Sequence, residues 1–343
     1  MENDANARLL KIQELSNKAL KRSEFAKKYG ALIVFAILII FNLIVTPGFV
    51  DSSTVWNLII HTTTTLVVAM GMTFVIATAG IDISVGSTMA LTAVVTATLL
   101  PVLGMAVSII VGLALGAGIG LLIGTLTVKF KIQPMVLTLA LMIALRSIAR
   151  MVSNAKTVNI ADEGFIGLSV NYIGGTVPVQ LIYVAVIAIV FYMIATRTVF
   201  GKSVEAIGNN PSAAKLSGIK ADKNTIMVYV LLGILSALAG CLAIARTMNC
   251  NPSSVGSGME MDAIAAVVIG GTSMMGGKPR VLGTVIGCFI ITLITTTVNM
   301  NGIPSEWSMV FKAAIIILAV YIQSEKKIKV RQSKIKPIAS KEA

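Results

Sequence analysis

The stretch TAGIDISVGSTMALTAVV, residues 78–95, places the carboxylate of Asp82 between two apolar runs that are each long enough to cross a membrane. Gly80 and Gly86 stand on either side of it. An ionised side chain at the centre of a bilayer costs about 2.5–3.5 kcal/mol on insertion scales, so it is normally paired, near an interface or turned toward a water-filled path. The stretch therefore marks a break between two membrane helices.

Composition identifies the class of protein. Of the 343 residues, 56% are apolar and only 13% are charged, and the mean hydropathy is +0.88. The apolar residues come in repeated runs of about 20, the length that crosses roughly 30 Å of hydrocarbon as a helix. We therefore expect an all-α, polytopic protein of the cell (inner) membrane.

The apolar runs predict about ten transmembrane helices. They lie near residues 30–49, 57–79, 84–103, 105–128, 134–152, 179–196, 225–248, 258–275, 281–300 and 308–323. The eighth is the weakest, because its uninterrupted apolar core, residues 263–271, is short enough for a re-entrant or half helix.

Lys and Arg orient the chain, because they gather in the cytoplasmic loops of inner-membrane proteins. They concentrate in a leader (1–29), in a loop at 197–224, in two further short connections and in a tail (324–343). Ten crossings within residues 30–323 place all of these inside, with both termini cytoplasmic. A re-entrant eighth segment would put the basic tail outside, so the charge pattern favours a full crossing. The net charge of +13 is thus explained by topology and lipid contact, and nucleic acid is not an expected partner.

Several kinds of active site lack the residues they need. His61 is the single histidine, so histidine triads and multi-histidine metal sites are excluded, and we expect it to form a hydrogen bond between helices. The string GGTSMMGGKPR is no phosphate loop, because Thr272 stands where glycine is required and Pro279 follows Lys278. We expect no cofactor in this chain, and any ATP to be bound by another subunit.

Four glycines predict close helix packing. Gly112, Gly116, Gly120 and Gly124 recur every four residues along the fourth predicted span. They form one face almost without side chains, which a neighbouring backbone can approach closely.

The basic loop at 197–224 contains a short helix signal. Asn210 can cap a helix that begins at Pro211, and Gly218 can close it, which predicts about two turns over residues 211–217. We expect Ala213 and Ala214 to be exposed and to leave room for a partner surface. The alternative is a linker helix lying on the membrane.

Three motifs carry a resemblance to a known family. GIDISVGS, AIGNNPSAAKLSGI and MEMDAIAAVVIGGTSMMGGKPRVLGTVIG, in this order and separation, resemble the membrane-spanning permease subunit of the ribose- and galactose-type ATP-binding-cassette sugar importers. The resemblance implies two permease copies, or two similar chains, around a central pathway. It also implies a cytoplasmic ATPase subunit beneath them and an extracytoplasmic binding protein that delivers the sugar.

The resemblance also implies roles for particular residues. The segment that couples the permease to the ATPase would contain Glu205, Gly208, Asn209, Pro211, Ala214 and Gly218. The translocation pathway or its gate would contain Asp82, Ser84, Gly86, Glu260 and Asp262. The alternative for the three carboxylates is helix capping, since each lies at the start of a predicted span.

The resulting hypothesis is a permease subunit of an ATP-driven importer that moves a monosaccharide by alternating access and catalyses no covalent step. Ribose ranks ahead of galactose, because the last outer connection lacks the aromatic-rich string of the galactose branch. One alternative is a secondary transporter or channel for small polar solutes, which would need paired membrane carboxylates for ion coupling, and these are scarce. Another is a membrane-embedded transferase, for which no loop gathers a cluster of acidic residues.

Overall fold

The computed structural model describes residues 30–304 and 306–323, and the predicted leader and basic tail lie outside these residues. The described chain is mostly helical. Its helices are Gly30–Val45, α2 Ser52–Ala77, α3 Val85–Lys129, α4 Pro134–Val152, α5 Glu163–Val170, α6 Gln180–Arg197, α7 Val199–Asn209, α8 Pro211–Leu216, α9 Ala221–Thr247, α10 Met259–Ile269, α11 Val281–Met300 and α12 Glu306–Gln323. Two short antiparallel ribbons pair β1 (Val158–Asn159) with β4 (Asn249–Cys250), and β2 (Tyr172–Ile173) with β3 (Val177–Pro178).

Six of the described helices, α2, α3, α4, α6, α9 and α11, are long and apolar enough to cross a membrane. The helix α3 contains two of the predicted spans, because its backbone breaks at Gly104, where φ is 74°. The two halves fold back on each other, so that Thr96 of the first half lies against Ser108 and Gly112 of the second. The sequence placed a boundary at this same residue, and that boundary is confirmed.

The eighth predicted span forms only a half helix. With 11 residues, α10 is about 16 Å long at 1.5 Å per residue, well short of the roughly 30 Å of hydrocarbon. Residues 252–258 before it form turns, with Gly256 and Gly258 at positive φ, a conformation that glycine adopts without strain. The half-helix alternative therefore describes α10, and a full crossing by residues 258–275 stays a prediction.

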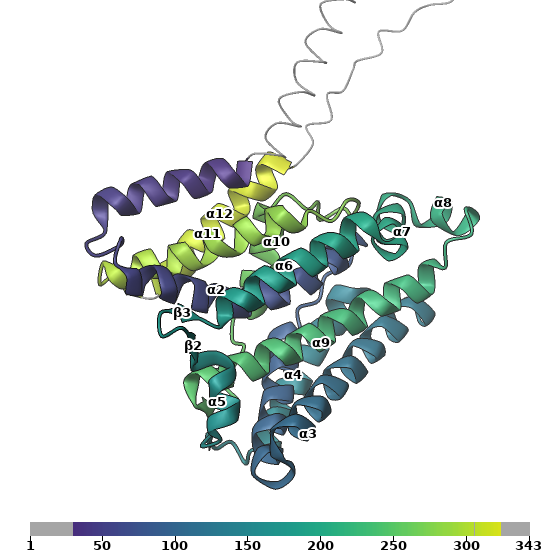
Figure 1. Ribbon diagram of the computed structural model, residues 1–343. Helices are drawn as coiled ribbons and strands as arrows, with labels where there is room; N and C mark the ends of the chain where they lie inside the picture. Colours follow the sequence, from purple (N-terminus) through teal and green to yellow (C-terminus); the bar gives the residue numbers. More distant parts are fainter. Residues whose placement is uncertain (1–29, 305, 324–343) are drawn as a thin grey trace, which may run out of the picture.

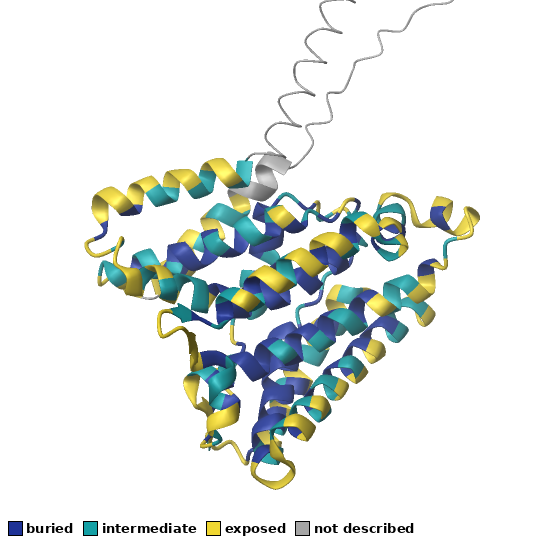
Figure 2. Ribbon diagram, in the orientation of Figure 1, coloured by how far each residue is buried: buried dark blue, intermediate teal, exposed yellow. Residues whose placement is uncertain are grey.

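The centre of the bundle is α2. Its residues from Thr62 to Ala77 are buried, because α6, α9, α10 and α11 all pack around it. By contrast, α4 and α6 turn mostly apolar, exposed side chains outward (Figure 2). An apolar outer surface around a buried helix is the pattern expected when lipid is the solvent.

The predicted glycine face is confirmed. Gly116, Gly120 and Gly124 lie directly against the backbone of α9, and Gly112 lies against the first half of α3. A Cβ added at Gly120 would lie 2.8 Å from backbone carbons of Tyr229 and Val230, closer than real side chains come. The absence of side chains is what lets the two helices meet.

The short helices α7 and α8 lie at the end of the bundle opposite β2 and β3 (Figure 1). The Asn210 side chain accepts a hydrogen bond from the Ala213 N–H at 3.0 Å, and Gly218 ends the turn at φ 81°. Both helix signals read from the sequence are thus confirmed. Ala213 is exposed as expected.

Ala214 corrects the expectation. It is only 4% exposed and packs with Ile207 of α7 and Ala221 of α9, because α8 turns this side toward the bundle. Ala214 therefore holds α8 in place, and the prediction that it offers an exposed surface was wrong. The large apolar side chain that α8 exposes is that of Leu216, at 91%.

At the C-terminal end of α7, Gly208 lies in direct backbone contact with two distant segments. A Cβ built on it would overlap the Ala77 carbonyl, where α2 ends, and the Gly277 nitrogen in the loop before α11. The Gly277 N–H also donates to that Ala77 carbonyl at 2.9 Å. Three segments far apart in the sequence thus meet at one point.

Candidate functional site

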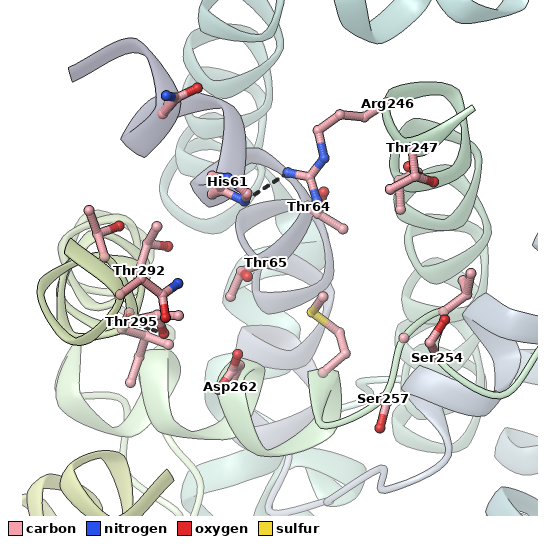
Figure 3. Close-up of a pocket in the computed structure, with 18 of the residues that line it drawn as sticks. His61, Thr64, Thr65, Arg246, Thr247, Ser254, Ser257, Asp262, Thr292 and Thr295 are labelled. Atoms are coloured by element: carbon pink, nitrogen blue, oxygen red, sulfur yellow. Dashed lines mark hydrogen bonds between the residues drawn. The ribbon is translucent and has the colours of Figure 1, made fainter. Parts of the chain in front are cut away.

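A cavity of about 630 Å³ lies between α2, α9 and α11, and α10, α12 and loop 251–258 complete its wall. This volume is within the range of small-molecule sites. Many of the lining side chains carry hydroxyl groups: Thr54, Thr64, Thr65, Thr247, Ser254, Ser257, Thr292, Thr295 and Thr296. Figure 3 shows most of them around the open space.

The threonines of α2 between residues 62 and 73 divide into two groups. Thr62, Thr63 and Thr73 donate to carbonyls of their own helix at 2.7–2.9 Å. Thr64 and Thr65 make no such bond among the described residues, and both line the cavity. A hydroxyl can donate and accept at once, so these groups suit an uncharged, polyhydroxylated ligand.

Two pairs of ionisable side chains lie at the cavity. A guanidinium nitrogen of Arg246, Nη1, lies 3.0 Å from His61 Nδ1 and so joins α9 to α2 (Figure 3). The predicted interhelical hydrogen bond of His61 is thus confirmed. The Lys312 Nζ lies 2.8 Å and 3.0 Å from the two carboxylate oxygens of Asp262 and joins α12 to α10.

Of the five residues predicted for the pathway or gate, Asp262 alone is among those that line the cavity. Asp82 is buried, and its Oδ1 accepts hydrogen bonds from the Ser84 N–H at 2.8 Å and the Ser84 Oγ at 2.6 Å. Burial raises the pKa of the Asp82 carboxyl, whereas both hydrogen bonds lower it. Ser84 is the N-cap of α3, and no side chain caps this helix with a hydrogen bond. Asp82 therefore orders the turn just before α3, and both the capping alternative and a transport role of Asp82 stay predictions.

Gly86 and Glu260 lie where α3 meets the loop before α10. A Cβ on Gly86 would overlap the Gly256 carbonyl and would also touch the Glu260 carboxylate. The loop is held from the other side by Arg146 of α4, whose Nη1 donates to the carbonyls of Pro252 and Val255. These residues shape one wall of the cavity without facing its interior.

The predicted coupling residues fall on α7 and α8. Glu205 is half-buried and lies 3.5 Å from Lys202, and Gly208 makes the backbone contact described above. The exposed members of the set are Asn209, Pro211 and Gly218. Leu216 of α8 is exposed as well.

Sequence reasoning missed most of the cavity wall. His61 was predicted only to form a hydrogen bond between helices, and no role was predicted for Arg246, Arg146 or Lys312. Each of these cations lies within or next to a predicted span, which by itself marks a functional residue. The run HTTTT at residues 61–65 was a second unused signal.

Comparison with known proteins shows the family. Residues 54–320 match the family described as the permease component of the branched-chain amino acid transport system. The chain belongs to this permease family. It is a multi-pass subunit of the inner membrane that serves transport, as the six membrane-length helices also indicate.

Curated relatives refine the comparison. The permease is 35% identical over 321 residues to the ribose import permease protein RbsC of Escherichia coli (strain K12), covering 92% of this chain and 99% of that protein. The ribose import permease protein of Bacillus subtilis (strain 168) is 35% identical over 323 residues, with the same coverage. The galactofuranose transporter permease protein YtfT of E. coli is 32% identical over 262 residues, 75% of this chain and 76% of that protein. No solved structure matches the permease significantly.

Proposed function

We propose that this permease is the membrane subunit of an ATP-driven importer and carries a monosaccharide through the cavity between α2, α9 and α11. The observation that carries the proposal is the lining of that cavity by hydroxyl groups, of which those of Thr64 and Thr65 make no hydrogen bond within the part of the chain that the structure describes. Relatives of nearly the same length are named as ribose permeases, and others are named for galactofuranose and fructose. Sugars are therefore preferred over the amino acids in the family description.

The proposed topology keeps ten crossings with both termini in the cytoplasm. Since α10 is too short to cross alone, loop 251–258 and α10 would together make the eighth crossing, which keeps the basic residues on one side. The hydrogen bond from the Gly277 N–H to the Ala77 carbonyl supports this arrangement. It brings the loop after α10 beside the end of α2, and the proposed topology places both in the cytoplasm.

The proposed partners follow from the same family. The ATPase subunit would bind ATP and receive α7 and α8, whose contact set is Glu205, Gly208, Asn209, Pro211 and Gly218 together with Leu216. Leu216 is 91% exposed, so it could bury its apolar side chain against a docked subunit, and burying a leucine contributes about 1.5–3 kcal/mol. Ala214 would act indirectly, by holding α8 against α7. A sugar-binding protein outside and a second copy of the permease complete the proposed assembly, which would work by alternating access.

Reconstitution tests the proposal directly. The permease is purified with its ATPase, incorporated into vesicles and supplied with the binding protein and radiolabelled ribose, galactose, fructose or leucine. We expect ATP-dependent uptake of one of the sugars. Uptake that needs no ATPase would show a secondary transporter, and uptake of leucine in place of every sugar would refute the proposed substrate class.

A further inference from the structure

The two cationic side chains that line the cavity differ in whether an anionic side chain neutralises them. Lys312 is neutralised by Asp262. Arg246 has no carboxylate partner among residues 30–304 and 306–323, and its one hydrogen bond there is to His61. Because a guanidinium has no acceptor site, the Nδ1 of His61 must accept this bond, so His61 is neutral in this arrangement. A half-buried positive charge therefore faces the cavity unpaired.

The hydrogen bond to His61 leaves most of the guanidinium free. A guanidinium carries five N–H groups in a fixed planar fork, and His61 occupies one nitrogen. Figure 3 shows the Arg246 side chain extending from α9 across to α2, close to Thr64. The free N–H groups and the Thr64 hydroxyl thus border the same part of the cavity.

The chemistry of the fork selects a ligand. Two parallel N–H groups match two oxygen acceptors held side by side, a geometry that an ammonium cannot provide. In a monosaccharide, a pair of adjacent ring hydroxyls presents two such oxygens. The neighbouring threonine hydroxyls can then serve the remaining donors and acceptors of the sugar.

We propose that Arg246 is a specificity-determining residue of this cavity, which donates two hydrogen bonds to an adjacent pair of hydroxyl oxygens on the transported monosaccharide, and that His61 is the positioning residue that fixes its guanidinium. The inference rests on the proposed function and names the contact by which the cavity distinguishes one sugar from another. It accounts for the unpaired charge, because the ligand supplies the acceptors that the protein lacks.

Uptake of monodeoxy sugars tests the contact. The complete transporter is assayed in vesicles with saturating, sugar-loaded binding protein, and the rate for the imported sugar is divided by the rate for each monodeoxy analogue. The ratios are compared between the wild type, Arg246→Gln and the control Arg150→Gln, an exposed arginine on α4 outside the cavity. Because every variant uses the same binding protein, its own preference cancels from the comparison.

We expect the wild type to take up two of the monodeoxy analogues, those that lack one or the other of two adjacent hydroxyls, at least tenfold more slowly than the imported sugar. Arg246→Gln should reduce this ratio of rates at least tenfold, and Arg150→Gln should keep the wild-type ratio. If Arg246→Gln does not assemble, Arg246→Lys keeps the charge without the fork and should lose the same discrimination. Unchanged deoxy ratios in an assembled variant would overturn the inference. Absence of any sugar uptake by the wild type would instead refute the proposed function.

Two further measurements test the role of His61 and the kind of oxygen acceptor that Arg246 binds. His61→Gln retains an acceptor and should keep the wild-type ratios, whereas His61→Phe should lose them, and equal ratios in the two variants would overturn the positioning role. The aldonic acid of the imported sugar is added as a competitor. If it inhibits wild-type uptake more strongly than the sugar itself but does not inhibit Arg246→Gln, the fork binds a carboxylate, and the hydroxyl assignment is wrong.

Discussion

Adding one methyl group at Gly120 should weaken the contact between α3 and α9. In Gly120→Ala the new Cβ would lie 2.8 Å from two backbone carbons of α9, where an ordinary contact begins at 3.4 Å. These atoms belong to a helix backbone and cannot rotate away, so the two helices must separate by at least about 0.6 Å. Such overpacking typically destabilises a core by about 1–3 kcal/mol.

Gly118→Ala is the matched control. Gly118 lies on the same helix, and a Cβ there would meet nothing within 4 Å. Replacing glycine by alanine inside a helix gains up to about 1 kcal/mol of helix propensity, and this gain is common to both variants. The difference between them therefore isolates the packing cost.

The assay is unfolding of the purified permease by titration with sodium dodecyl sulfate, followed by circular dichroism. We expect Gly120→Ala to unfold with a free energy about 1–3 kcal/mol lower than that of Gly118→Ala. Equal unfolding free energies of the two variants would show that α3 and α9 can move apart without loss of stability. The argument that the glycine face holds α3 and α9 together would then be wrong.

Three further outcomes follow from the described contacts. Leu216→Glu should reduce co-purification with the ATPase and sugar-stimulated ATP hydrolysis without changing the melting temperature of the isolated permease. Ala214→Glu should instead lower that melting temperature, because it forces an unpaired charge into a packed site. Asp82→Ala should lower the unfolding free energy by about 1–3 kcal/mol, because it leaves a buried N–H without an acceptor; normal stability would contradict the capping role. Asp262→Ala should lower stability and abolish uptake, since removing one partner leaves the other charge unpaired. Adding Lys312→Met to this variant should restore insertion and stability but not uptake. Full uptake by the single variant would exclude a function of the pair.

Much of the fold could be predicted because the signals are local. Apolar runs, the Gly104 boundary, the glycine face and the Asn210 and Gly218 signals each depend on residues within a few turns of one another. The side of α8 that Ala214 occupies could not be predicted in this way. It depends on how α8 lies against α7 and the start of α9, which is a tertiary contact.

The candidate site was harder to predict, because its wall comes from segments up to 258 residues apart in the chain, from Thr54 to Lys312. The sequence drew attention to acidic residues in motifs, and of these Asp262 reaches the cavity. The threonines and Arg246 belong to no short motif. Their common position becomes visible only when α2, α9 and α11 are placed side by side.

The backbone contact at Gly208 has a mechanical consequence. Side chains between two elements can yield by changing rotamer, but here α7 touches the end of α2 and the loop before α11 with no side chain between them. Because no side chain can adjust at this contact, a movement of α7 must displace Ala77 and Gly277 as well. Since α2 and α11 also form two walls of the cavity, this contact joins α7 directly to both walls.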